Sequence, residues 1–148
     1  MTDNPTRSAG TPWHLWTVGA VSLLWNAVGA LDFTMTQARN EAYLQAFTPE
    51  QREYFFRFPF WVVAAWGLAT WGSLTGSVLL LLRRRLAVPV NGAVLVAMAV
   101  TFLHNYVLTD GLAVMGGAGP VFFTAVIVLI GVLLWLYARA MRTRGVLR

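Results

Sequence analysis

The chain has 148 residues, of which 57% are hydrophobic and only 11% are charged, and its mean hydropathy is +0.61. Soluble domains carry about 25% charged residues. The composition therefore excludes an ordinary soluble domain and predicts a protein that uses lipid as its solvent. The chain has no cysteine, which excludes disulfides, thiolate metal sites and cysteine nucleophiles.

The net charge of +5 comes from arginine, because the sequence contains no lysine. A strongly basic chain can indicate nucleic-acid binding. Here the arginines stand at the ends of apolar runs, as the positive-inside rule places them in membrane proteins. The charge pattern therefore argues against a nucleic-acid partner and predicts the lipid bilayer as the surroundings of the chain.

The first elements in the chain are a polar tail and an apolar run. Residues 1–12 are predicted to form a disordered cytoplasmic tail, and residues 15–33 a first span that begins near the interfacial residues Trp13 and Trp16. The run is longer than the roughly 7–15 residues of a signal-peptide core, and it contains Asn26. An uncleaved span is therefore favoured over a cleaved signal peptide.

Residues 34–58 form a long connection that mixes arginine with glutamate and so lies outside the hydrocarbon. Within it, Thr48-Pro49-Glu50-Gln51 is typical of a helix start, with Thr48 as N-cap, Pro49 at the first helical position and Gln51 completing a capping box. Aromatic residues interleaved with charges follow. They predict a short amphipathic helix lying on the membrane surface.

Three more apolar runs predict spans over about 60–82, 88–108 and 121–137, and residues 139–148 form a basic cytoplasmic tail. The predicted fold is an all-α integral membrane four-helix bundle, with residues 13–138 as a single four-span domain. Three spans with a peripheral hydrophobic helix remain as an alternative. The arginines after the second and fourth spans place both termini in the cytoplasm and the connection 34–58 outside.

Small residues follow two of the predicted spans at helical spacing, which allows neighbouring helices to approach closely. In the first span they form a seam that is expected to face the third span. In the second span they form a stripe. The predicted helix-packing residues are Gly19, Ser22 and Gly29 on the first span, together with Asn26, and Ala65, Ala69, Gly72 and Gly76 on the second.

Polar residues of the first and third spans are predicted to lie at the same depth, because both spans run outward. They make up a candidate polar pocket open to the outside: Asn26, Asp32, His104, Asn105 and Asp110. His104 could bind a ligand or carry a proton, with Asp32 as its partner. The alternative is structural, with the amides and the imidazole hydrogen-bonding between helices and the two carboxylates in interfacial water.

Other chemistries find little support in the sequence. One histidine and two aspartates without close ligand spacing do not predict a metal site. His14 and His104 fall at opposite ends of their spans and cannot share one haem iron, so no cofactor is predicted. No catalytic constellation is complete, and an enzyme is not expected.

Several motifs together resemble a family of small, uncharacterised bacterial four-span inner-membrane proteins, some of which carry a sugar transporter label. The resemblance covers nearly the whole chain. It rests on the arginine-rich stop and on the segments Leu23-Leu24-Trp25-Asn26-Ala27-Val28-Gly29-Ala30, Asp32-Phe33-Thr34-Met35-Thr36-Gln37, Thr48-Pro49-Glu50-Gln51 and Phe58-Pro59-Phe60-Trp61. It implies four spans and a bacterial cytoplasmic (inner) membrane, and it supplies no catalytic residue.

Two functions follow as hypotheses. The first is a non-enzymatic membrane protein that handles a small solute through the outward-facing polar pocket, with Asp32 and His104 as its main polar pair. The second is a non-catalytic accessory or scaffold subunit, whose small-residue stripe and surface helix dock a larger membrane complex. A homo-oligomer is a further possible partner arrangement, since four short spans enclose little space.

Overall fold

The computed structural model describes residues 10–148, and within them every regular element is helical. Residues 1–9 of the predicted tail lie outside the described residues. The elements in chain order are α1 (Trp13–Gln37), α2 (Glu41–Leu44), α3 (Pro49–Phe56), α4 (Phe60–Leu81), α5 (Ala87–Leu103), the π-helical turn η1 (His104–Leu108), α6 (Gly111–Val114) and α7 (Ala118–Thr143).

Four helical segments are long and apolar enough to cross a membrane: α1, α4, α5 continued by η1, and α7. This confirms the predicted all-α four-helix bundle and a membrane protein. Helices α1 and α7 are longer than the predicted spans of 15–33 and 121–137. The reason is that hydropathy marks only the part in hydrocarbon, whereas the backbone hydrogen bonds of a helix continue into the polar interface.

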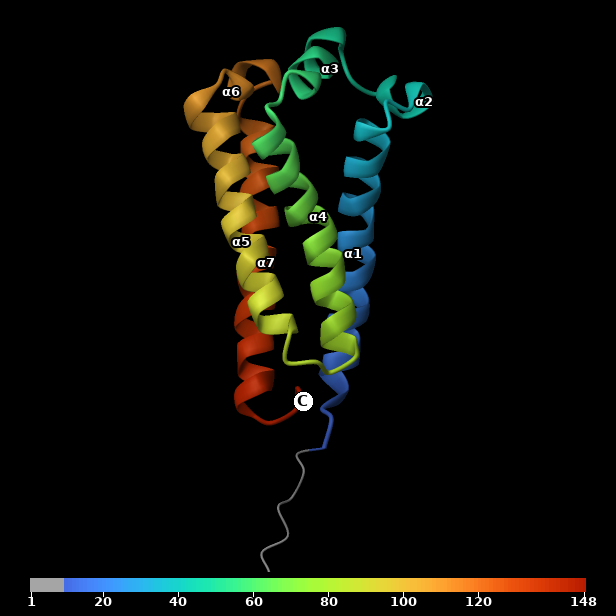
Figure 1. The fold of residues 1–148 in the computed structure, drawn as a ribbon, viewed down its shortest axis with the longest axis vertical. Helices are drawn as coiled ribbons and strands as arrows, with labels where there is room; N and C mark the ends of the chain where they lie inside the picture. Colours follow the sequence, from blue (N-terminus) through green and yellow to red (C-terminus); the bar gives the residue numbers. More distant parts are fainter. Residues whose placement is uncertain (1–9) are drawn as a thin grey trace, which may run out of the picture.

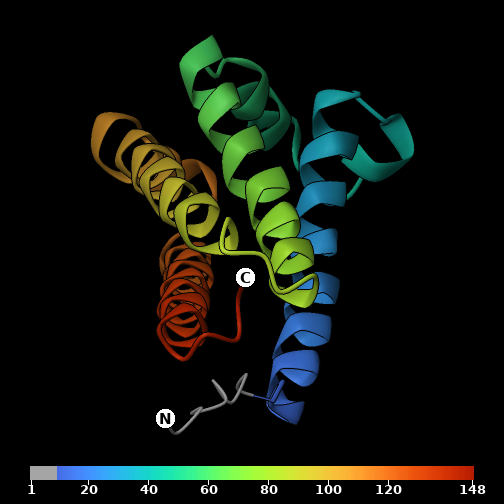
Figure 2. The ribbon, with the colours of Figure 1, turned by 60° about the horizontal axis from the view of Figure 1, so that its bottom comes forward.

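The long helices alternate in direction and pack in chain order, α1 on α4, α4 on α5 and α5 on α7 (Figure 1). With the lower end turned toward the viewer, α1 and α7 stand at opposite ends of this row of helices, and the last residues of the chain turn back between them (Figure 2). We call the lower end in Figure 1 the arginine end, because it carries Arg83–Arg85 and the arginines after α7, and the upper end the loop end.

Helix α4 holds the bundle together because it has small residues on two faces. On one face, an added Cβ at Gly72 would lie 2.7 Å from Val94 Cγ2, and one at Gly76 would lie 2.6 Å from Asn91 Oδ1. Side chains of α5 therefore pack directly against the α4 backbone here. On the other face, Ser73 and Ser77 meet α1. The predicted docking stripe is thus covered by α5 at Gly72 and Gly76, while Ala69 is buried and Ala65 half-buried.

The seam of small residues on α1 faces α4, the second span, and its expected placement against the third span is wrong. The amide of Asn26 donates hydrogen bonds to the Ser73 carbonyl oxygen (3.2 Å) and to Ser77 Oγ (2.9 Å). Gly19 lies against Leu81, and Gly29 faces Thr70. Helices joined by a connection of this kind pack as antiparallel neighbours, and α4 then separates α1 from α5.

The arginine end is closed by a hydrophobic cluster that includes the last residues of the chain. Leu15, Leu80 and Met141 are buried there together with Val146 and Leu147. The backbone of Arg148 pairs with the α4–α5 turn, donating to the Arg83 carbonyl (2.7 Å) and accepting from the Arg85 amide (3.0 Å). The segment predicted as a basic tail therefore continues α7 to Thr143 and then packs against the bundle.

At the loop end, the capping box predicted from the sequence is present. Thr48 Oγ1 accepts from the Gln51 amide, and the Gln51 side chain accepts from the Thr48 amide, which starts α3 at Pro49. The Tyr54 hydroxyl of α3 hydrogen-bonds to Thr109 Oγ1 (2.7 Å) beyond η1. This contact fixes α3 across the end of the bundle, where its aromatic side chains turn toward the interior.

Candidate functional site

A cavity of about 490 Å³ occupies the half of the bundle nearer the loop end. Side chains of α1, α4, α5, η1 and α7 form its sides, and residues of the connection between α1 and α4 line it at the loop end. Its wall is rich in aromatic rings: Trp25, Tyr43, Phe47, Tyr54, Phe55, Phe58, Trp66, Tyr106 and Phe123. It reaches Ser73, halfway along α4.

The cavity opens toward the side of the bundle. Its most exposed wall residues are Val28 (67% exposed) on α1 and Phe123 (56%) on α7. These two helices do not pack against each other along their length. Between these helices the rings of Trp25 and Phe123 meet with centroids 6.3 Å apart. In a membrane this side faces the lipid, so an apolar molecule could reach the cavity from the bilayer.

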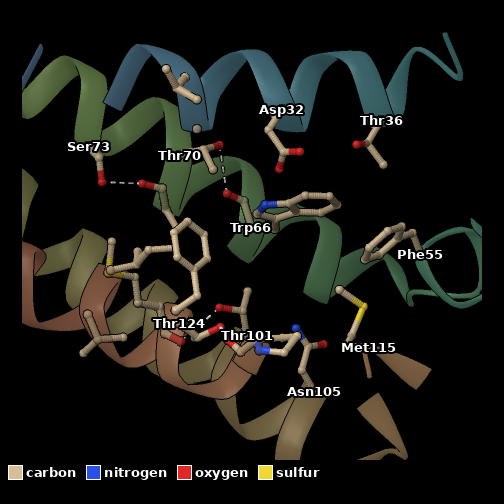
Figure 3. Close-up of a pocket in the computed structure, with 18 of the residues that line it drawn as sticks. Asp32, Thr36, Phe55, Trp66, Thr70, Ser73, Thr101, Asn105, Met115 and Thr124 are labelled. Atoms are coloured by element: carbon tan, nitrogen blue, oxygen red, sulfur yellow. Dashed lines mark hydrogen bonds between the residues drawn. The ribbon is translucent and has the colours of Figure 1, made fainter. Parts of the chain in front are cut away.

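Asp32 is the one charged residue among the described residues that line the cavity. Figure 3 shows its side chain pointing from α1 into the space, with the Trp66 ring below it in the view. Its Oδ1 accepts a hydrogen bond from the Tyr43 hydroxyl. Burial, followed by the hydrogen bond and the charge of Asp32, raises the pKa of Tyr43 to about 12. Tyr43 thus stays protonated and keeps donating to the carboxylate at neutral pH.

The basic residues of the connection are all engaged away from Asp32. The Arg39 guanidinium stacks over the Phe56 ring at 4.5 Å, and Arg52 Nε donates to the Phe47 carbonyl oxygen (3.0 Å). Arg57 pairs with Glu53, which is the only ion pair within residues 10–148. The negative charge of Asp32 is therefore not balanced by a protein cation.

The raised pKa of Tyr43 predicts a loss of stability at high pH. An unfolded tyrosine ionises near pH 10, whereas the folded one keeps its proton to about pH 12. The unfolded state therefore loses a proton first, and folding stability falls as pH rises from about 10 to 12. In thermal unfolding at several pH values, Tyr43→Phe is expected to show a shallower fall than the wild type. An identical fall would contradict the assignment, and Tyr106→Phe serves as the matched control.

The residues predicted for the polar pocket divide into two groups. Asn26, Asp32 and Asn105 line the cavity. His104 does not: its ring is buried between Phe58 and Trp61, with centroid distances of 5.1 and 5.5 Å. Asp110 is exposed at the start of α6.

The expected pairing of Asp32 with His104 is wrong, because each has another partner. His104 Nδ1 lies 3.0 Å from Asn105 Oδ1, and Asp32 is bound by Tyr43. The π-helical turn η1 accompanies this arrangement, and Thr109 Oγ1 donates to the His104 carbonyl oxygen (2.8 Å). Such turns occur often at functional sites. Here the turn places Asn105 and Tyr106 in the cavity wall and His104 outside it.

Several wall residues were not predicted from the sequence, above all Tyr43, Trp66, Thr70 and Thr124. A signal exists for Thr70, which stands three residues before Ser73 and so shares its side of α4. Thr124 is a polar residue in the fourth apolar run, which is itself informative in a span. Tyr43 carries no such signal, since it belongs to the connection and reaches Asp32 only through the turn after α1.

Within residues 10–148 no group of three or more histidine, aspartate or glutamate side chains is placed to hold a metal ion. Comparison with known proteins finds no match to this chain among protein-family models, curated proteins or solved structures.

Proposed function

We propose that this membrane protein binds a small organic solute in the cavity between α1, α4, α5 and α7. The observation that carries the proposal is the cavity itself, about 490 Å³ of space inside a bundle of only four spans. Small-molecule sites measure about 300–1,000 Å³ and combine an apolar wall with a few polar groups. The wall here is mainly apolar and rich in aromatic rings, and it holds one carboxylate and two amides, those of Asp32, Asn26 and Asn105.

Packing alone does not account for such a space. Membrane helices associate mainly through close packing, and a void in the interior forfeits these contacts. Side chains of α5 pack directly against the α4 backbone at Gly72 and Gly76, nearer the arginine end. The loop-end half of the same bundle stays open, and polar side chains line it. A space with room for a ligand therefore supports a binding function more directly than a purely structural one.

A single-cysteine experiment tests whether the cavity admits small polar molecules. The chain has no cysteine, so each variant carries one thiol. Thr124 lines the cavity, and the adjacent Ala125 is exposed on the other side of α7 at nearly the same depth. In lipid vesicles, Thr124→Cys is expected to react with 2-aminoethyl methanethiosulfonate at least tenfold faster than Ala125→Cys, because a thiolate forms in a wet cavity and not in lipid. Equal rates would contradict the proposal.

We also propose that the arginine end lies in the cytoplasm of a bacterium and that the protein resides in the inner membrane. The asymmetry of arginine supports the orientation, since Arg83–Arg85 and the arginines from Arg139 onward gather at one end. The arginines of the loop end are mixed with glutamates. The resemblance to small bacterial four-span proteins supports the membrane assigned. No chemical step is proposed, and the solute is bound rather than transformed.

An accessory subunit is the second candidate, and the surroundings of α7 favour it. Helix α7 is the least buried of the four spans, and among the long helices it packs on α5. A partner helix or a second copy could cover its free face, where Phe122, Leu129 and Leu133 are exposed. Native mass spectrometry from mild detergent distinguishes the cases. A defined complex that Leu129→Trp disrupts supports a subunit role, and a monomer contradicts it.

A further inference from the structure

We infer that the solute bound in the cavity is an organic cation, an amine with a hydrophobic body whose charged nitrogen binds at Asp32. The inference rests on the proposed function and goes further by assigning the chemical class of the ligand. Three features of the cavity carry it: its charge, the direction of its hydrogen bonds and its aromatic wall.

The charge of the cavity is negative. Asp32 is the one charged residue among its described lining residues, and Arg39, Arg52 and Arg57 have other partners. A carboxylate in such a partly enclosed site is costly without a positive partner. Oδ1 accepts from Tyr43, and a neutral hydroxyl balances no charge. A ligand cation supplies the partner that the protein does not provide.

Most hydroxyl groups of the wall face the cavity as acceptors, because their protons already form hydrogen bonds within the protein. Four of them donate to carbonyls of their own helix at 2.6–3.1 Å: Thr70 to Trp66, Ser73 to Ala69, Thr101 to Met98 and Thr124 to Pro120. Tyr106 can then donate to Thr124 (2.8 Å), as Tyr43 donates to Asp32. These oxygens keep free lone pairs.

The amide of Asn26 adds to this pattern. Both of its N–H groups bind α4, at the Ser73 carbonyl and Ser77 Oγ, which leaves its oxygen as an acceptor. The wall donors not engaged in this way are the Asn105 amide, the Thr36 hydroxyl and the indoles of Trp25 and Trp66. An anion requires donors, and a sugar requires donors and acceptors in similar number. A wall in which acceptors predominate, and whose one charge is a carboxylate, instead matches an ammonium group, which has only donors.

The aromatic wall suits the rest of such a ligand. Trp66 lies in an aromatic cluster at the loop end of the cavity, with ring centroids 5.1 Å from Phe33, 6.0 Å from Phe55 and 6.2 Å from Phe58. Faces of aromatic rings attract cations and also pack against apolar groups. The opening between α1 and α7 faces lipid, where an amine with a hydrophobic body partitions.

Three ligands of one shape and different charge test the inference: 2-phenylethylamine, 2-phenylethanol and phenylacetate, with glucose as a fourth probe. Binding is measured by tryptophan fluorescence of the full chain in phosphatidylcholine nanodiscs, with empty nanodiscs subtracted. The amine is expected to bind at least tenfold more tightly than the alcohol and the acid. Asp32→Asn keeps an acceptor for Tyr43 and is expected to remove this preference. Glu41→Gln, an exposed acid outside the cavity, is the matched control and should retain it.

The outcomes separate the two proposals. If the alcohol, the acid or glucose binds as tightly as the amine or more tightly, the assignment of a cationic ligand is overturned, while the proposal of solute binding stands. An amine affinity that survives in folded Asp32→Asn does the same. Absence of binding by all four probes overturns both. If Asp32→Asn does not fold, the ranking of the three matched ligands in the wild type decides alone.

Discussion

Replacement of Gly76 by leucine is expected to disrupt the bundle, with a loss of more than about 3 kcal/mol in the free energy of unfolding. A Cβ at this position would lie 2.6 Å from Asn91 Oδ1 and 2.8 Å from its Nδ2, both of them buried. Asn91 cannot simply turn away, because its amide donates to the Ala87 carbonyl oxygen (2.7 Å). Overpacking a well-packed core costs about 1–3 kcal/mol, and here it also separates α4 from α5. Thermal unfolding in detergent measures the loss.

Two further variants show whether the close approach of α4 and α5 is the cause. Gly119→Leu makes the same substitution in α7, where an added Cβ meets nothing within 4 Å, and is expected to leave the melting temperature nearly unchanged. Asn91→Ala removes the three atoms nearest to a Cβ at Gly76. It is expected to restore part of the stability lost in Gly76→Ala, as a double-mutant cycle measures. If the stability losses of Gly76→Ala and Asn91→Ala simply added in the double variant, the packing explanation would be refuted.

Replacement of Gly29 by phenylalanine is expected to fill the cavity and to weaken binding of 2-phenylethylamine at least tenfold. Gly29 lines the cavity, and an added Cβ would meet only Thr70 Cγ2, at an ordinary 4.0 Å. The ring can therefore enter the space without displacing the backbone. Phenylalanine also has a higher helix propensity than glycine, by less than about 1 kcal/mol. Binding should be lost while the melting temperature is kept or rises.

Ala27→Phe is the matched control for this variant. Ala27 is exposed and does not line the cavity, although it lies only two residues before Gly29 on the same helix. The variant adds the same ring on the outside of α1 and should bind the amine as the wild type does. If Gly29→Phe retained full affinity with an intact fold, the ligand would bind elsewhere.

The sequence predicts the helices well because each of them follows from local information. Apolar runs longer than the hydrocarbon thickness define the spans. The α3 start at Thr48-Pro49-Glu50-Gln51 follows from a four-residue motif, and the structure shows both capping-box hydrogen bonds. The extra turns of α1 and α7 are missed, since hydropathy says nothing about how far a helix continues into the interface.

The pairing of helix faces depends on residues far apart in the sequence, and the predictions of packing partners from sequence fail. The small residues of α1 indicate a packing face but not its partner, and the structure places α4 there through Asn26, Ser73 and Ser77. The burial of Val146 and Leu147 is equally hidden in sequence, because a basic segment after a span resembles a solvated tail. Only the meeting of α1, α4, α5 and α7 at the arginine end creates the apolar cluster in which these two residues are buried.

The candidate site shows the same division between features that the sequence predicts and features that depend on packing. Depth along the spans brings Asn26, Asp32 and Asn105 to one cavity, as a sequence argument about depth can predict. Which of the residues at this depth face the cavity depends on the rotation of each helix about its axis. His104 precedes Asn105 by one residue, yet it packs against Trp61 and the wall residue Phe58 and does not itself line the cavity. The ring of Tyr43 comes from the connection, whose path no helical periodicity describes.

The most direct test of the central claim, that the cavity is a ligand site, is to locate a bound probe. Crystals soaked with 2-(4-bromophenyl)ethylamine give an anomalous signal from bromine alone. We expect one dominant bromine peak within the cavity, near the rings of Phe55 and Trp66, with density for the amine extending to the Asp32 carboxylate. Bromine peaks confined to the lipid-facing surface, with the cavity empty at a probe concentration that saturates binding in solution, would contradict the claim.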